Sequence, residues 1–200
     1  MVSDPASPVK RMKRADRRQQ ILSAATKAFA RTGFAATSLD DITAEAGISK
    51  VILYRLFESK TDLYRSVLAR VGARLDAAVG TDNHTAESIP ALLRAAAADP
   101  DGFRLLFRYA AREPEFDDHW GVTSAQSTDI ALRQLVAVIP DPKWAQWAAH
   151  MAPIITIEAV LAWLDAGQPD PDTAADRISA TIGALIGAAQ RPSEQPGSPH

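Results

Sequence analysis

The feature that most constrains the fold of this chain is a repeated signal for the start of a helix. Downstream of residue 90, three Asp-Pro pairs, at 99–100, 141–142 and 170–171, each place a carboxylate directly before a proline. The carboxylate can accept from free N–H groups of the first helical turn, and proline at the first position lacks an N–H that would be unpaired there. No segment shows the sustained apolar–polar alternation of a half-buried strand. The sequence therefore predicts an all-α fold, with helices at about 85–98, 100–112, 115–139, 141–166 and 170–190.

The totals indicate an ordinary soluble protein. The 200 residues are 46% hydrophobic and 23% charged, which suits one large or two small domains with a real core. The absence of cysteine excludes a disulfide framework, a thiolate metal site and a cysteine nucleophile. The four histidines are scattered, so neither a metal site nor a cofactor is predicted. With no signal peptide and no 18-residue apolar run, we expect a cytoplasmic protein that makes no membrane contact.

The charge is distributed unevenly. Residues 1–60 contain 11 Lys and Arg against 6 Asp and Glu, a net charge of +5, whereas the remaining residues carry −7. A basic third on an acidic remainder suggests a polyanionic partner for one end of the chain; a basic tail without a partner is the alternative. Residues 1–15 are predicted to be a flexible basic arm, and residues 191–200 a disordered tail.

Four helices are predicted between the arm and residue 80. An apolar stripe from Ile21 to Phe29 marks the first, which Gly33 is expected to end. The second begins at Thr37 or Ser38 with an aspartate three residues later, and Gly47 stops it. Ser49 is the expected cap of a short third helix, and Ser59 starts a fourth that continues to about residue 80. Two short helices joined by a glycine turn are typical of a helix-turn-helix, which leaves one face of its second helix exposed.

The residues of this segment resemble the DNA-binding domain of the TetR family of regulators. The resemblance covers residues 16–64, about a quarter of the chain. It is carried by a series of aromatic, glycine and Ser-Lys positions: Phe29, Gly33-Phe34, Thr37-Ser38, Ile42, Ala46-Gly47-Ile48-Ser49, Leu53-Tyr54-Arg55, Phe57, Ser59-Lys60 and Leu63-Tyr64. It implies a three-helix DNA-binding domain followed by a larger antiparallel helical domain, residues 65–190, for effector binding and dimerisation.

The resemblance also implies which side chains meet DNA. Lys50 and Val51 are the best candidates for base readout, whereas Tyr54 and Lys60 match positions that meet the phosphate backbone. The full set of candidates is Thr37, Ser38, Ser49, Lys50, Val51, Ile52, Tyr54, Arg55 and Lys60. The chain departs from the family where Val51 and Ile52 replace smaller residues and where Asp40 stands in place of a frequent arginine. A carboxylate facing DNA is repelled unless it is paired, so we do not expect the second helix to contact bases. The basic residues of the arm (Lys10, Arg11, Lys13, Arg14, Arg17, Arg18) either reach DNA or make no contact.

The last two helices are predicted to form a homodimer interface. Their apolar stripes, interleaved with small residues, would assemble four helices about a twofold axis. The candidate residues are Ile157, Leu161, Leu164, Ile178, Ile182 and Leu185. The alternative is that these stripes fill the core of the subunit.

An aromatic-rich middle segment predicts a pocket for a small apolar or acidic effector. The candidate lining residues are Phe103, Phe107, Trp120, Trp144, Trp147 and Met151, although an ordinary core is the alternative. No phosphate loop, nucleophile elbow or metalloprotease motif supports an enzyme. The sequence thus predicts a transcriptional repressor that leaves a palindromic operator when an effector binds; a helical ligand carrier that does not bind DNA is the rival hypothesis.

Overall fold

A computed structural model describes residues 13–191; for residue 114 and residues 117–124 it describes the backbone alone. All regular secondary structure in this part of the chain is helical, which confirms the predicted all-α fold. The chain divides into two compact units, Met1–Val67 and Leu68–His200.

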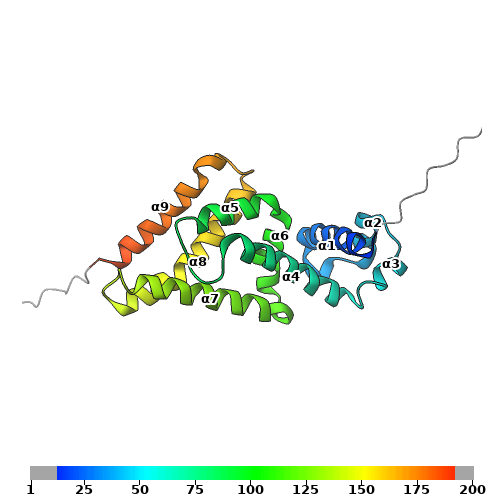
Figure 1. The fold of residues 1–200 in the computed structure, drawn as a ribbon, viewed down its shortest axis with the longest axis horizontal. Helices are drawn as coiled ribbons and strands as arrows, with labels where there is room; N and C mark the ends of the chain where they lie inside the picture. The colour runs from blue at the N-terminus through cyan, green and yellow to red at the C-terminus, as the bar shows by residue number, and fades with distance from the viewer. Residues whose placement is uncertain (1–12, 192–200) are drawn as a thin grey trace, which may run out of the picture. The chain divides into compact units, whose positions relative to one another are not determined.

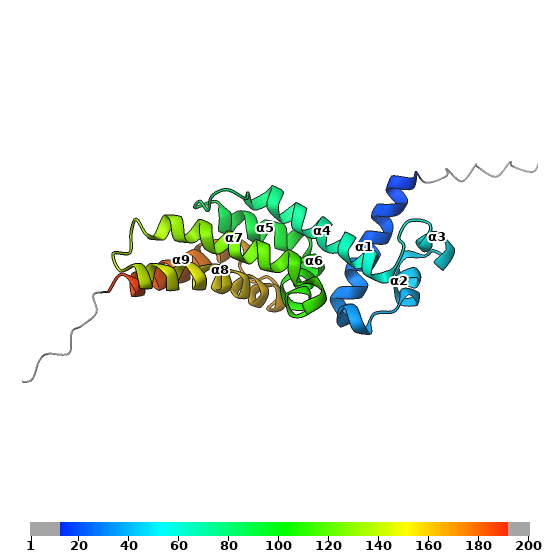
Figure 2. The same cartoon turned by 90° about the horizontal axis from the view of Figure 1, so that it is seen from below.

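The smaller unit is built from four helices (Figures 1 and 2). They are α1 (Arg14–Ala36), α2 (Leu39–Ala46), α3 (Lys50–Tyr54) and the first residues of α4 (Lys60–Val79). Each helix contributes large side chains that are almost completely buried, including Phe29 from α1, Ile42 from α2, Leu53 from α3 and Tyr64 from α4. The Phe29 and Tyr64 rings meet edge to face with centroids 4.8 Å apart. This core holds the short helices in place, since a helix of five residues is not stable by itself.

Helix α1 differs from its prediction at both ends. Gly33 does not end it: the backbone bends there, with φ 77° and ψ 176°, and helical residues continue to Ala36. Only glycine adopts that backbone conformation easily. At the other end the helix already includes Arg14, Arg17 and Arg18, which were predicted to lie in or beside the arm. Lys10 and Arg11 lie outside the described residues.

The larger unit contains the rest of α4 and four further long helices. They are α5 (Ser88–Ala98), α7 (Asp117–Leu135), α8 (Pro142–Asp165) and α9 (Pro171–Ala189), and α8 packs against both α7 and α9. The helix predicted at 100–112 is instead three short pieces: α6 (Pro100–Arg104), a π-helical turn η1 (Leu105–Tyr109) and a 3-10 turn η2 (Ala110–Arg112). A second 3-10 turn, η3 (Pro114–Phe116), precedes α7.

Two of the three Asp-Pro pairs cap helices as predicted. The Asp99 carboxylate accepts from the Gly102 N–H at 3.0 Å, and Asp141 accepts from the Lys143 N–H at 2.8 Å. Asp170 makes no cap hydrogen bond. Its backbone is left-handed, with φ 43°, and its carboxylate faces Arg177 at 3.7 Å instead. The left-handed backbone turns the side chain of Asp170 away from the first-turn N–H groups of α9.

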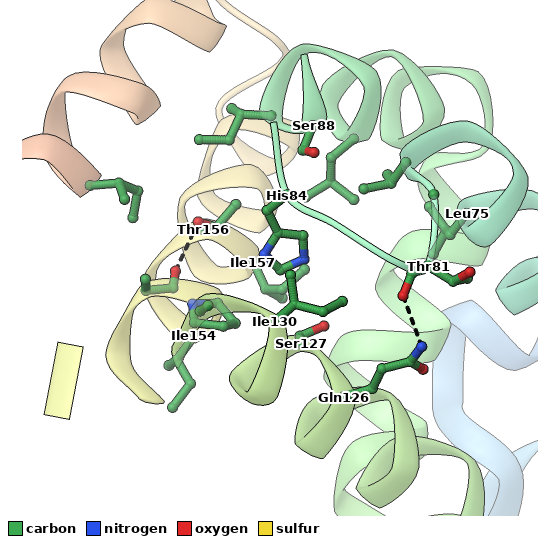
Figure 3. Close-up of a pocket in the computed structure, with 18 of the residues that line it drawn as sticks. Leu75, Thr81, His84, Ser88, Gln126, Ser127, Ile130, Ile154, Thr156 and Ile157 are labelled. Atoms are coloured by element: carbon green, nitrogen blue, oxygen red, sulfur yellow. Dashed lines mark hydrogen bonds between the residues drawn. The ribbon is translucent and has the colours of Figure 1, made fainter. Parts of the chain in front are cut away.

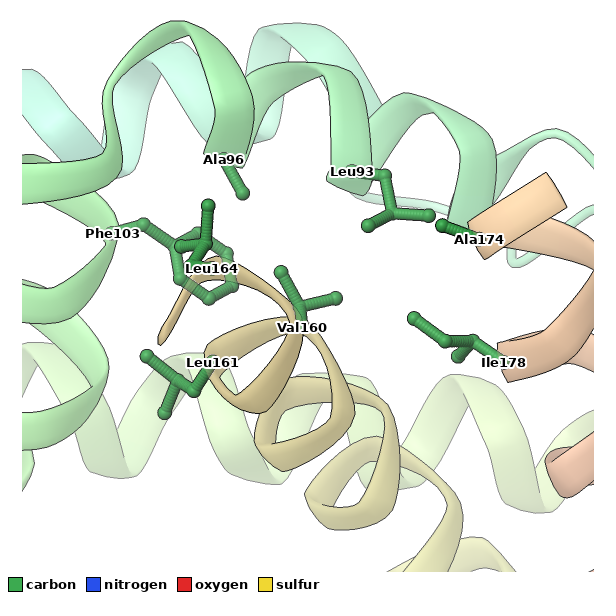
Figure 4. Close-up of a cluster of buried hydrophobic side chains, with 8 residues drawn as sticks. All are labelled: Leu93, Ala96, Phe103, Val160, Leu161, Leu164, Ala174 and Ile178. Atoms are coloured by element: carbon green, nitrogen blue, oxygen red, sulfur yellow. The ribbon is translucent and has the colours of Figure 1, made fainter. Parts of the chain in front are cut away.

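Three residues predicted for the dimer interface lie instead in the core of the larger unit. Leu161, Leu164 and Ile178 lie inside it, each no more than 7% exposed, and pack with side chains of α5 and α6 (Figure 4). A side chain buried within its own subunit has almost no surface left for a second copy. These three residues therefore stabilise the subunit. The alternative interpretation of the stripes, as core, holds for them.

Candidate functional site

The turn between α2 and α3 is set by a cap at each end of α2. The Ser38 hydroxyl accepts from the Asp41 N–H at 3.1 Å, and the Asp41 carboxylate accepts from the Ser38 N–H at 2.9 Å. The Ser38 hydroxyl also donates to the Asp41 carboxylate at 2.7 Å. This hydrogen bond, and then the one from the Ser38 N–H, hold the pKa of Asp41 below its usual value, so the carboxylate of the capping box stays charged at neutral pH. At the other end Gly47 is left-handed, with φ 62°, which lets the Ile48 N–H reach the Thr43 carbonyl at 3.0 Å.

Contacts from α1 fix the orientation of α2. The Gln20 side-chain amide donates to the Ala46 carbonyl at 2.8 Å, at the end of α2. The Glu45 carboxylate lies 3.0 Å from the Arg31 guanidinium and 3.8 Å from the Lys27 ammonium. Since α3 is anchored to the same core by Leu53, the two short helices have a defined angle. The face of α3 opposite Leu53 is thus presented on a rigid support.

This outward face of α3 is the candidate nucleic-acid interface. Val51 and Tyr54 are 60% and 53% exposed, unusually high for large apolar side chains. Arg55 and Ser49 are also exposed, whereas Ile52 is half-buried. Ser49 occupies the N-cap position of α3 but makes no side-chain cap hydrogen bond, contrary to its expected role. Its hydroxyl is therefore not occupied by the helix. The face combines hydroxyl groups, cations and methyl groups, the chemistry that reads base edges and thymine methyls in a major groove.

Lys50 does not stand alone on this face. Its ammonium lies 2.8 Å and 2.9 Å from the two carboxylate oxygens of Asp40, which belongs to α2. The hydrogen bond to Asp40 raises the pKa of Lys50, so the lysine remains protonated at neutral pH. Both side chains are well exposed, so the pair is solvated and can be exchanged for other partners. The carboxylate of Asp40 is thus paired with a cation of α3.

Three other predicted DNA-contacting residues lie at the ends of helices. Ser38 is exposed at the start of α2. Thr37 is 2% exposed, and its hydroxyl donates to the Gly33 carbonyl at 2.7 Å. Its side chain is therefore buried within the smaller unit, and its hydroxyl is hydrogen-bonded to the backbone. Lys60 begins α4, where its ammonium lies 4.5 Å from the centroid of the Phe34 ring and 3.4 Å from the Ala35 carbonyl.

One contact of this surface, the ion pair between Asp40 and Lys50, was not predicted from the sequence. Its only signal was negative: an acidic residue at a position where a cation was expected. Two side chains ten residues apart would not be in contact on a single helix, where neighbours are three or four residues apart. Asp40 and Lys50 are in contact only because the glycine turn brings the start of α2 beside the start of α3.

The larger unit contains a cavity of about 500 Å³ (Figure 3), a size typical of sites for small molecules. Aliphatic side chains of α4, α5, α7, α8 and α9 form most of its lining. Among the aromatic residues predicted for a pocket, Phe107 lies on the lining. Phe103 is 1% exposed in the neighbouring core, where its ring centroid lies 4.5 Å from that of Phe107.

The remaining residues predicted for the pocket lie elsewhere. Trp144 and Trp147 are each 40% exposed on α8 and pack edge to face on one another, with centroids 5.4 Å apart. Met151 is half-buried and is not part of the cavity lining. The side chain of Trp120 lies outside the described part of the chain. Aromatic content thus pointed to the correct half of the chain but not to the cavity itself, whose lining is mainly aliphatic.

Comparison with known proteins agrees with this geometry. Residues 21–67 match the family model for bacterial regulatory proteins of the tetR family. The transcriptional activator FasR of Mycolicibacterium smegmatis is 31% identical over 180 residues, which cover 83% of this chain and 81% of that protein. The transcriptional repressor SCO4008 of Streptomyces coelicolor is 38% identical over 89 residues, which cover 44% of this chain and 46% of that protein. A TetR-like regulator from Rhodococcus sp. RHA1 has a similar fold, with a TM-score of 0.78, 23% identity and coverage of 90% of this chain and all of the other.

The chain belongs to the TetR family of helix-turn-helix, DNA-binding transcriptional regulators. This is a family of regulators and not of enzymes, in agreement with the sequence-based expectation. The outward face of α3 falls inside the matched segment.

Proposed function

We propose that this protein is a cytoplasmic homodimeric repressor that binds a palindromic operator and leaves it when a small molecule occupies the cavity. The outward face of α3 carries the proposal. Lys50, Val51 and Tyr54 are exposed there on a helix fixed by its buried side, which suits insertion into a major groove. A single helix of five residues makes few base contacts, so specific binding needs a second copy one helical turn, roughly 34–36 Å, along the duplex.

An exposed apolar surface on α8 and α9 supports the dimer. Helix α8 is long and apolar enough to cross a membrane by length and composition alone, but only 28% of its most apolar window is buried within the chain. Trp144, Trp147 and Ile154 are each at least 40% exposed on it. Helix α9 exposes a stripe of small residues: Ala180, Gly183, Ala184, Gly187 and Ala188. A helix packed against others in a water-soluble unit is covered more readily by a second copy than by lipid.

Helix α4 supports the link between ligand and DNA. It runs without a break from Lys60 to Val79, and it contributes residues to both units. Five of its residues line the cavity: Leu68, Gly72, Leu75, Asp76 and Val79. A ligand that favours one position of α4 favours one separation of the two recognition helices, and only this difference in affinity shifts the population away from the operator-binding state.

The proposal is tested by selecting duplexes from fragments of the source genome with the wild type and with Lys50→Ala. We expect the wild type to select a twofold-symmetric site. We expect Lys50→Ala to change the preferred bases at one position of each half-site, because a lysine in the groove reads guanine acceptors. Tyr54→Phe removes only a hydroxyl and is expected to weaken binding to DNA of every sequence by the same factor. An unchanged preference for Lys50→Ala would remove this residue from base readout, and a selection without any enriched site would reject the proposal.

A second prediction concerns Asp40. Because its carboxylate both occupies Lys50 and repels phosphates, Asp40→Asn is expected to tighten operator binding about 3- to 10-fold. It should also steepen the dependence of affinity on salt by about one counterion per subunit. The measurement is fluorescence anisotropy of a labelled operator over a range of salt concentrations. Glu58→Gln is the matched control, since it removes an exposed carboxylate of the same unit that is not bound to Lys50. Weaker binding by Asp40→Asn would mean that Asp40 positions Lys50 for its contact.

Activation is the second candidate function, because the relative that matches most of this chain, FasR, is named an activator. A repressor blocks polymerase from a promoter that its operator overlaps, whereas an activator requires an operator beside the promoter. A reporter driven by the selected site distinguishes them: expression rises on deletion of a repressor and falls on deletion of an activator.

A further inference from the structure

The lining of the cavity limits the charge of its ligand. It includes two acidic residues, Asp76 and Glu158, and not a single Lys or Arg among the described residues that form it. Both acidic side chains are exposed, so they are hydrated at the edge of the cavity. An anionic ligand would therefore lose its hydration in an aliphatic environment without gaining a cation, which costs several kcal/mol in general. It would also meet two like charges on entry.

Most polar groups on the lining are already occupied by the protein. The Thr156 hydroxyl donates to the Ala152 carbonyl at 2.8 Å, and the Gln126 amide donates to the Thr81 carbonyl at 2.9 Å (Figure 3). The Gln134 amide donates to the His84 carbonyl at 2.5 Å. The Ser88 hydroxyl accepts from the Thr85 N–H at 2.9 Å. The bonds from Gln126 and Gln134 tie the loop before α5 to α7, and together the four bonds leave few polar atoms for a ligand.

The His84 side chain is not occupied in this way. Its ring is directed into the cavity between Ile130 and Ile157 (Figure 3), and no hydrogen bond to its nitrogens is found within the described residues. Burial, and then the nearby charge of Arg133, lower the pKa of His84. The imidazole is consequently neutral at physiological pH and offers one N–H donor and one nitrogen acceptor.

We propose that the cavity binds an uncharged, largely apolar small molecule whose single polar group forms a hydrogen bond with His84. This inference rests on the proposed function, since it names the class of effector for the same cavity. It excludes the acidic effector that the sequence had left open. The aliphatic lining supplies affinity by burying apolar surface, and the imidazole of His84 supplies orientation.

The test uses two fluorescent probes with one scaffold and different charge. N-phenyl-1-naphthylamine is neutral and has one N–H donor, and 8-anilinonaphthalene-1-sulfonate adds a sulfonate to it. We expect the neutral probe to bind one per chain and the sulfonate at least 10-fold more weakly. Tetraphenylphosphonium, a lipophilic cation, is expected to displace the neutral probe only at high concentration. Tighter binding of either charged compound than of the neutral probe would overturn the proposal.

A variant at Gly72 locates the binding. Gly72 lines the cavity from α4, and a Cβ built there meets no atom within 4 Å, so Gly72→Leu fills space without a clash near the backbone. We expect it to reduce binding of the neutral probe at least 10-fold. Ala73→Leu is the matched control, because it adds the same side chain to an exposed neighbouring position of α4 outside the lining. Equal probe binding by Gly72→Leu and the wild type would refute the cavity as the site.

Two further variants test the hydrogen bond. His84→Phe keeps an aromatic ring but offers no partner, and we expect roughly 3- to 10-fold weaker binding of the neutral probe. His84→Gln keeps a donor and an acceptor and is expected to recover most of that loss. If His84→Phe bound the neutral probe as tightly as the wild type, the proposed hydrogen bond to His84 would be wrong. Operator binding, measured on the same samples without ligand, keeps the two proposals distinguishable: a wild-type protein that binds the operator but not the neutral probe rejects only the ligand class.

Discussion

Val51→Glu is expected to abolish specific operator binding while leaving the fold intact. Val51 is 60% exposed near the start of α3, so the change removes no core contact, and a carboxylate is favoured in the first turn of a helix. On DNA, however, the same carboxylate enters a groove lined by phosphates and acceptor atoms, once in each half-site. We expect at least a 100-fold loss of operator affinity, roughly 2.7 kcal/mol.

The measurement is anisotropy of the labelled operator, together with a thermal melt. Val138→Glu is the matched control, because Val138 is 50% exposed in the larger unit and receives the same substitution. The control is expected to bind like the wild type. If both variants bound equally well and melted normally, α3 would not be the DNA-contacting helix.

The second large effect is expected from Gly187→Trp, which should convert the proposed dimer to a folded monomer. A Cβ at Gly187 meets no atom of its own chain within 4 Å, so the subunit tolerates a larger side chain there. Across a twofold interface of closely approaching helices the indole would collide with the partner. Because a monomer engages one half-site only, we expect operator affinity to fall at least 100-fold, roughly 2.7 kcal/mol.

Light scattering gives the mass and circular dichroism the helix content of this variant. Ala73→Trp, an exposed small residue of α4, serves as the control and is expected to remain dimeric. A Gly187→Trp protein that stays dimeric and binds DNA would move the interface away from the small-residue face of α9.

Local signals predicted the helices well because they are properties of neighbouring residues. The cap at Asp99 and the glycine turn at Gly47 follow from hydrogen bonds and dihedral angles within four residues. Asp170 shows the limit, since its left-handed backbone depends on the loop after α8 and not on the Asp-Pro pair. The break after α6 at Leu105 likewise has no signal in a pattern of apolar residues.

The exposed face of α3 was predictable from the sequence, because a short helix with a buried side must leave its other side exposed. Val51 and Tyr54 could be placed because their neighbours on α3 had to face a core. The residues proposed for the dimer interface and the cavity could not be placed in this way. An apolar stripe in the sequence does not indicate whether the same subunit or another molecule buries it. Leu161 is covered by the subunit itself, and Trp144 is not. Only tertiary packing distinguishes the two, as it does for the contact between Asp40 and Lys50.

The most direct test of the account is site-specific cross-linking from α3 to DNA. The chain has no cysteine, so Val51→Cys provides a single attachment point for a photoactivated aryl azide. On the selected operator, we expect cross-links to bases in both half-sites, symmetric about the centre of the site and roughly one helical turn apart. Val138→Cys carrying the same reagent should give none. An absence of cross-links from position 51 on an operator that the labelled protein still binds would contradict the central claim.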